Sequence, residues 1–176
     1  MSELTLDTLH RLCVATNRAA FGHWGIRNSC VGTSGALLDV LTAHGIEARP
    51  LRVEAAVRGF GPIGAVLGSF GDGSRRPAAA PGCWAGHLTV VAVERFLLDP
   101  TLDQVEGAEP WTSEVTDAFL KGDETLWFDK PFPHRPGVTL RYHAYPTKGG
   151  WKSAPAFRQG NRWPVVAAVL AQLVSE

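Results

Sequence analysis

Three side chains that lie far apart in the sequence have the types that build a thiol nucleophile: Cys30, His87 and Asp99. A cysteine attacks a carbonyl carbon as its thiolate, and a histidine that takes the thiol proton is in turn oriented by a carboxylate. In "GHLTVVAVERFLLDPT" the histidine opens one apolar run, and the aspartate closes a second run just before Pro-Thr. The pattern predicts Cys30 as the nucleophile, His87 as its base and Asp99 as the group that orients the imidazole.

The residues that follow Cys30 predict that this cysteine opens a helix over residues 30–44. Ser29 is a candidate N-cap, the leucines of "CVGTSGALLDVLTAH" recur at helical spacing, and Gly45 stands where many helices end. The N-terminus of a helix favours negative charge and therefore suits a thiolate.

His87 and Asp99 share a face of the hairpin predicted over residues 87–99 only if its loop has an odd number of residues. In an antiparallel hairpin the residue numbers of any two paired positions add up to the same value. Two residues on the two strands face the same side when their own numbers add up to a value that is even or odd as that one is. A loop at residues 93–95 meets this condition, whereas a two-residue turn at residues 94–95 does not. Because the segment lacks the Asn-Gly or Asp-Gly of a tight two-residue turn, the odd loop is permitted.

Three further helices are predicted from apolar spacing or from capping residues. The first covers residues 5–21 with Thr5 as a candidate cap, and a short one is expected over residues 113–120. In the last, Asn161 is the candidate cap, Pro164 falls in the first turn, and the apolar residues form one broad face.

Strands are predicted over residues 46–57, where Pro50 argues for an edge or a bulge, and in "LWFDKPFP" and "GVTLRYHAYP". Residues 58–82 are rich in glycine and proline and predict a long loop or flap, with a helical part at residues 63–67. The order of elements predicts one α+β domain over residues 1–176, with N-terminal helices packed on an antiparallel sheet and a C-terminal helix.

The composition argues against several classes of partner. The 17 Lys and Arg residues balance 17 Asp and Glu residues, so neither nucleic acid nor an anionic membrane is expected as the main partner. The N-terminal segment lacks the pattern of a secretory signal, and the apolar run near the C-terminus is shorter than the roughly 20 residues that cross a bilayer. Three cysteines at wide spacing argue against a disulfide framework, so a cytoplasmic location is expected.

The segments "NSCVGTSGALLDVLTAHGIEARPLRV" and "GHLTVVAVERFLLDPT" together resemble the transglutaminase-like core, part of the papain-like cysteine-enzyme superfamily. The family pattern is a Cys that opens a helix, the strand motif "GI-x-AR-x-x-x-V", a His that begins a strand, and an Asp in "DPT". Here these are Cys30, residues 45–53, His87 and Asp99, in an order that arylamine N-acetyltransferases share. The resemblance covers about residues 25–104 and implies amide hydrolysis or acyl transfer through a thioester.

The resemblance also implies a papain-like fold and a peptide or small amide or acyl substrate, through chemistry that requires no metal or organic cofactor. Two features depart from the family pattern: Leu88-Thr89 stands where an aromatic residue commonly follows the histidine, and the segment over residues 58–82 is longer than a minimal core needs. These departures leave the substrate and the acceptor open.

An oxyanion hole would use the backbone N–H of Cys30 together with a second donor, for which Asn28 ranks first among Asn28, His23 and Trp24. Candidate walls of a substrate groove are the tryptophans Trp84, Trp111 and Trp127.

Two other functions remain open from the sequence: an N-acyltransferase that uses acyl-CoA, and a non-catalytic binding module on the same fold. Each residue of the triad alone also has a structural explanation, as a buried thiol, a histidine bonded to a backbone carbonyl, or an aspartate that begins a turn. Among the other cysteines, Cys13 falls on an apolar helix face and Cys83 at the end of a loop, so both are weaker nucleophiles.

A metal site is the remaining alternative, with Cys83, His87 and Asp99 as ligands and His134 or His143 as a fourth. Structural zinc sites normally combine two Cys or His pairs, and no second pair accompanies Cys83 and His87. No metal site is therefore predicted.

Overall fold

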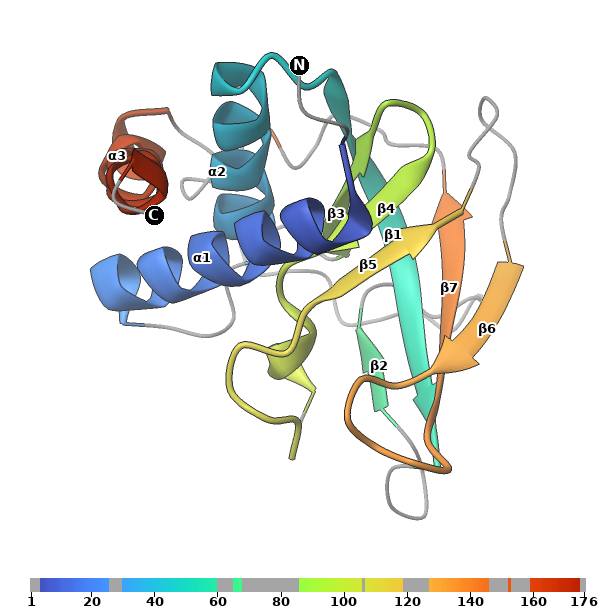
Figure 1. Cartoon of the computed structure of the whole chain (residues 1–176). Helices are drawn as coiled ribbons and strands as arrows, with labels where there is room; N and C mark the ends of the chain where they lie inside the picture. The colour runs from blue at the N-terminus through green and yellow to red at the C-terminus, as the bar shows by residue number, and fades with distance from the viewer. Residues whose placement is uncertain are drawn as a thin grey trace.

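The structure, a computed structural model, describes residues 4–25, 30–59, 65–67, 86–105, 107–118, 127–145, 152 and 159–174. Its elements are α1 (Leu6–Trp24), α2 (Cys30–Ala43), β1 (Ala48–Arg58), β2 (Ala65–Leu67), β3 (His87–Ala92), β4 (Phe96–Asp99), the short 3-10 helix η1 (Leu102–Gln104), β5 (Glu114–Asp117), β6 (Trp127–Pro131), β7 (Thr139–Tyr145) and α3 (Gln159–Val174). The helices gather on one side of an antiparallel sheet (Figure 1), so the predicted α+β class is confirmed.

The sheet has the strand order β5-β4-β3-β1-β7-β6, and β2 pairs with β1 beside this path. Every pairing is antiparallel. Although β5 and β6 lie at opposite ends of the order, the Lys130 ammonium on β6 bonds the Glu114 carboxylate on β5 and donates to the Thr116 hydroxyl at 2.9 Å. The sheet is therefore curled into a half-barrel that brings its two end strands into contact.

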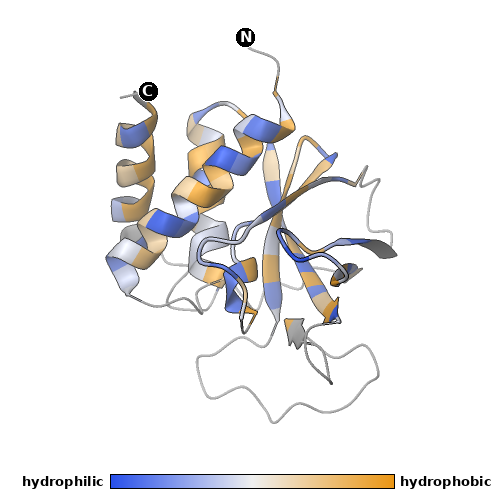
Figure 2. Ribbon diagram, turned by 60° about the horizontal axis from the view of Figure 1, so that its bottom comes forward, coloured by the Kyte–Doolittle hydropathy of each residue, from blue (hydrophilic) through white to orange (hydrophobic). Residues whose placement is uncertain are grey.

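Alternate residues of β3 and β4 face two separate cores, as the period of two requires. On β3 and β4, Val90 and Leu98 face the helices, whereas Val91 and Leu97 face the inside of the curl. Figure 2 shows hydrophilic and hydrophobic residues alternating along the strands. The helix-side core includes Leu9, Leu12, Leu37, Val40, Val165 and Val169, and the inner core includes Val53, Ala55, Leu102, Phe132, Leu140 and Tyr142.

The three helices form a layer of their own. Helix α1 packs against β4 and β5, α2 packs against β1 and β3, and α3 packs on α1 and α2. The guanidinium of the buried Arg162 on α3 lies 3.1 Å from the Asp39 carboxylate on α2, which ties these two helices together. Among the described residues, no helix combines the length and the apolar character needed to cross a bilayer.

The two N-terminal helices begin where the sequence predicts. Thr5 caps α1 by accepting a hydrogen bond from the Thr8 N–H at 3.2 Å, and α2 begins at Cys30. Helix α1 ends at Trp24, three residues beyond the expected residue 21, because Trp24 still packs against the helix-side core. Helix α2 ends at Ala43, and Gly45 follows in the left-handed conformation (φ 68°) that glycine adopts without strain.

Two predicted helices are strands. Residues 114–117, within the helix expected over residues 113–120, form β5 and pair with β4 through Leu97 and Thr116. Residues 65–67, expected as the end of a helical part at 63–67, form β2 and pair with β1 through Ala56 and Val66. Both segments are short, and pairing with a neighbouring strand outweighs their weak helical pattern. Otherwise only residues 58 and 59 of the predicted flap at 58–82 lie within the described residues.

Two predictions that rest on proline need correction. Strand β1 is internal, since it pairs with both β3 and β7, and Pro50 pairs with Val90 of β3. The expected edge position of Pro50 is therefore wrong. Helix α3 begins at Gln159, so Asn161 lies within the helix instead of capping it, and Pro164 comes after the first turn.

We expect Gly59→Ala to lower the free energy of unfolding by about 2 kcal/mol. Gly59 has φ 85°, and a Cβ atom there would lie 2.8 Å from the backbone oxygen of Gly137. Gly22 lies in α1, where a Cβ atom would meet no neighbouring group within 4 Å. The control Gly22→Ala should therefore raise the free energy of unfolding by about 0.5–1 kcal/mol. Urea unfolding of the two variants measures both values, and equal stabilities would contradict the strain at Gly59.

Candidate active site

The β3–β4 hairpin places His87 and Asp99 on the same face. The strands pair Val90 with Leu98 and Ala92 with Phe96, so the loop is the three-residue one at 93–95 and the parity condition is met. The His87 Nε2 and Asp99 Oδ2 atoms are 2.7 Å apart. The two side chains are 1% and 0% exposed, so this polar pair is withdrawn from water.

The loop itself shows why the chain turns at residues 93–95. Val93 and Glu94 adopt the left-handed region with φ 47° and 52°, and the Arg95 N–H donates to the Ala92 carbonyl at 3.0 Å. The Arg49 guanidinium on β1 holds the Glu94 carboxylate with contacts of 2.7 and 3.0 Å. These contacts offset the strain of two non-glycine residues at positive φ and fix the register that aligns His87 with Asp99.

Four hydrogen-bond contacts surround the Asp99 carboxylate. On Oδ2, the contact with His87 Nε2 is joined by the Tyr142 hydroxyl, which donates at 2.8 Å. On Oδ1, the Thr101 N–H donates at 3.1 Å and the Thr101 hydroxyl at 3.4 Å. A buried carboxylate is stable only when donors replace its water, so these contacts fix its position and orientation.

Tyr142 is the residue of this site that the sequence analysis missed. It lies on β7, opposite Ala55 of β1, is 1% exposed, and reaches Asp99 across the inside of the curl although β3 and β1 separate β7 from β4. The alternation of "GVTLRYHAYP" predicts its strand, but no local signal shows that its hydroxyl reaches Asp99. Only the curl of the sheet brings them together.

Cys30 is the first residue of α2 and is buried beside the start of β3. Its thiol donates to the carbonyl oxygen of Gly86, the residue before His87, at 3.8 Å. One helical turn further on, the Ser34 hydroxyl donates to the Leu88 carbonyl at 2.6 Å. These two contacts seat the N-terminal turn of α2 against β3 on either side of His87.

The His87 ring interacts with both other members of the triad. Burial by itself lowers the pKa of the imidazole, but the charge and hydrogen bond of Asp99, joined by the hydrogen bond and charge of Cys30, raise this pKa to about 10. Because Nε2 is bonded to Asp99, Nδ1 is the ring nitrogen that remains for the thiol. The ring therefore lies between the Asp99 carboxylate and the Cys30 thiol, the order in which a thiol nucleophile, its base and the orienting group act together.

The other candidate residues have different outcomes. The second oxyanion donor Asn28 and the groove candidate Trp84 lie outside the described residues, as do Ser29 and Cys83. Cys13 is fully buried in the helix-side core, where burial, followed by the charges of Asp99 and Glu114, raises the pKa of its thiol. Cys13 is therefore a neutral small hydrophobic side chain, as predicted.

Among the aromatic candidates, Trp111, His23 and Trp24 lie within the described residues and make ring contacts. Trp111 contacts Phe21 of α1, with ring centroids 5.2 Å apart. The ring centroids of His23 and Trp24, at the end of α1, are 6.2 Å apart. In the part of the chain that the structure describes, no three His, Cys, Asp or Glu residues come together in a way that could hold a metal ion.

Comparison of this chain with protein-family models, with curated proteins and with solved structures finds no match.

We expect stability to fall with rising pH in a way that depends on Asp99. The folded-state pKa of His87, about 10, lies above the ordinary value of 6.5, so the folded protein holds a proton that the unfolded chain loses. This stabilisation is complete below pH 6.5 and is lost as pH rises towards 10, at no more than about 1.4 kcal/mol per pH unit for one proton. Urea unfolding at pH 6.5, 7.5 and 8.5 measures the slope, which Asp99→Asn should flatten. Equal slopes in the two proteins would contradict the ion pair.

Replacement of Tyr142 by Phe should raise the pKa of His87 further, by about one unit. The Tyr142 hydroxyl and His87 both contact Asp99 Oδ2, and a hydrogen bond to a charged group is worth about 1.5 kcal/mol. Once the hydroxyl is lost, the carboxylate oxygen interacts more strongly with the protonated imidazole, which raises the pKa of His87. NMR titration of isotope-labelled His87 measures the shift. The control Thr89→Val removes a buried 3.0 Å hydrogen bond to the Leu51 carbonyl on the same sheet without touching Asp99. Thr89→Val should lower the free energy of unfolding and leave the pKa of His87 unchanged. If the pKa of His87 is the same in Tyr142→Phe and Thr89→Val, this role for Tyr142 is rejected.

Proposed function

We propose that the protein is a cysteine-dependent enzyme that hydrolyses an amide or peptide bond, or transfers its acyl group, through a thioester on Cys30. The observation that carries the proposal is the buried His87–Asp99 pair, whose second ring nitrogen is available to a thiol at the start of a helix. The helix that begins with cysteine, packed on a curled antiparallel sheet that carries the His and the Asp, supports a papain-like fold with a transglutaminase-type core.

The chemistry begins with attack of the Cys30 thiolate on the substrate carbonyl carbon. The carbonyl oxygen becomes an oxyanion, and the Cys30 backbone N–H is one donor for it, since the first N–H groups of a helix have no partner within the helix. His87, which holds the thiol proton, donates it to the amine as the carbon–nitrogen bond breaks. The products of this step are a thioester on Cys30 and a free amine.

The second step removes the acyl group from Cys30. His87, now neutral, takes a proton from water as the water oxygen attacks the thioester carbon, which releases the carboxylic acid and returns the thiolate and the imidazolium. An amine in place of water gives acyl transfer instead. Asp99 keeps one tautomer and one orientation of the ring through both steps, and Tyr142 holds the Asp99 oxygen that contacts it.

Activated esters test the nucleophile directly, because they acylate a reactive thiolate without a specific acceptor. We expect p-nitrophenyl acetate to release nitrophenolate and to leave an acetyl group on Cys30, located by mass spectrometry of the quenched protein. Cys30→Ser should reduce the release by at least about a hundredfold, and His87→Gln by a similar factor. Cys13→Ser is the matched control, since Cys13 is fully buried and should leave the rate unchanged.

Two further measurements separate the rival functions. Acetyl transfer from acetyl-CoA to an arylamine, with no hydrolysis of amides, would identify an N-acyltransferase. Iodoacetamide labelling near pH 6.5 should modify Cys30 much faster than Cys13 if the thiolate is present. Equal and slow labelling of the two cysteines, together with no acylation by the ester, would reject the enzyme and favour a binding module.

A further inference from the structure

A pocket lies beside α1, and two of its lining residues, Ala15 and Leu173, also belong to or pack against the helix-side core. It has a volume of about 500 Å³ and is lined by α1, the segment over residues 109–113, the C-terminal part of α3, and His134 from the turn before β7. None of Cys30, His87 and Asp99 lines it. The volume is within the range of small-molecule sites, roughly 300–1,000 Å³.

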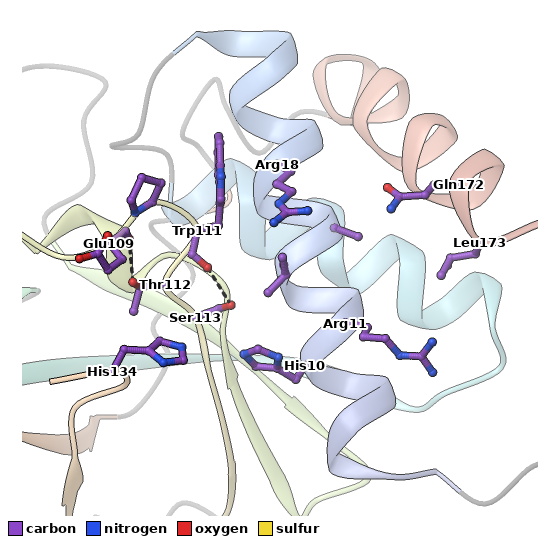
Figure 3. Close-up of a pocket in the computed structure, with 13 residues that line it drawn as sticks. His10, Arg11, Arg18, Glu109, Trp111, Thr112, Ser113, His134, Gln172 and Leu173 are labelled. Carbon is purple, nitrogen blue, oxygen red and sulfur yellow. Dashed lines mark hydrogen bonds between the residues drawn. The ribbon is translucent and has the colours of Figure 1, made fainter. Parts of the chain in front are cut away.

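The pocket combines an apolar surface with basic groups. Val14 and Ala15 of α1, Trp111 and Leu173 supply the apolar part. Figure 3 shows Arg18 and Trp111 at one end of the pocket and the rings of His10 and His134 turned toward each other at the other end.

The charges of the lining favour an anion. Arg18 is exposed and forms no ion pair with any other described residue, whereas Arg11 lies 3.3 Å from Asp7. The acidic residue of the lining is Glu109, whose carboxylate faces Arg135 at 3.5 Å and is therefore partly neutralised. The side chain of Arg18 is left to a ligand, and a guanidinium binds planar oxyanions through paired hydrogen bonds.

The wall that carries Trp111 is held by its own contacts. Trp111 packs edge-on against Phe21, the Thr112 hydroxyl donates to the Glu109 carbonyl at 2.6 Å, and the Ser113 hydroxyl donates to the Trp111 carbonyl at 3.3 Å. Trp111 and His134 both have positive φ, 64° and 58°. Among the described residues, the other non-glycine residues with positive φ are Val93 and Glu94 of the β3–β4 loop, so two of the four such positions line this pocket. Backbone strain of this kind is often found at ligand sites.

We infer that this pocket binds a small aromatic oxyanion, a carboxylate or phosphate carried on a flat ring. The ring packs against Trp111 and the apolar residues of α1, and the oxyanion pairs with the Arg18 guanidinium. This site is separate from the proposed thiol chemistry, and its ligand is bound without being changed.

Isothermal titration calorimetry tests the site with benzoate and phenyl phosphate as probes. The titrations use the Cys30→Ser variant, so that covalent reaction at the proposed nucleophile does not contribute. We expect at least one probe to bind with a Kd below about 1 mM, and the tighter probe identifies the anionic group. Benzyl alcohol, which has the ring alone, and inorganic phosphate and acetate, which have the anion alone, should each bind at least about tenfold more weakly.

Two variants assign the binding to this pocket. Arg18→Gln should weaken binding of the tighter probe by at least about fivefold, and Trp111→Leu should do the same through loss of the ring contact. Arg58→Gln, which removes an exposed arginine from the end of β1 outside the pocket, is the matched control and should have no effect. No saturable binding, or binding that Arg18→Gln leaves unchanged, overturns the inference. Either result leaves the proposal for Cys30 untouched, because none of Cys30, His87 and Asp99 lines this pocket.

Discussion

The buried hydrogen bond between His87 and Asp99 is the constraint on which the rest of this structure depends. Both groups are withdrawn from water, and an ionised pair in such a place is stable only when its remaining polar atoms are also bonded. Asp99 therefore draws contacts from three parts of the chain: His87 on β3, Tyr142 on β7, and Thr101 just beyond β4. These parts cannot shift relative to one another without leaving a buried charge without its partners, so the requirement for a stable carboxylate also fixes the positions of His87 and Tyr142.

The curl of the sheet satisfies that requirement. A flat sheet with this strand order would keep β7 two strands away from the β3–β4 hairpin, beyond the reach of a tyrosine hydroxyl. The contact of Lys130 on β6 with Glu114 and Thr116 on β5 joins the two ends of the strand order and holds the curl. Glu114 lies directly opposite Asp99 on the neighbouring strand, so this lysine also balances the second of two adjacent buried acidic groups.

The segment after Asp99 connects the cluster of Cys30, His87 and Asp99 to the pocket beside α1. Thr101 bonds the Asp99 carboxylate, and the Asp103 N–H donates to the Thr112 carbonyl at 3.1 Å, next to Trp111 in the pocket wall. The same short stretch of chain therefore orients the Asp99 carboxylate and supports the wall of the pocket beside α1. The two sites share backbone supports but no lining residue.

The sequence by itself determined the features that depend on local periodicity: the α+β class, the helix that begins at Cys30, the hairpin between His87 and Asp99, and the odd loop that puts both on one face. Each follows from a helical or strand period that neighbouring residues already contain. Only the tertiary structure decided that Tyr142 completes the carboxylate site, that residues 114–117 form a strand instead of a helix, and that Pro50 lies within an internal strand. These outcomes come from pairing and packing between segments that are distant in the sequence. The free energy of such a contact depends on which segment lies opposite, and the residues next to each position in the sequence do not specify that segment.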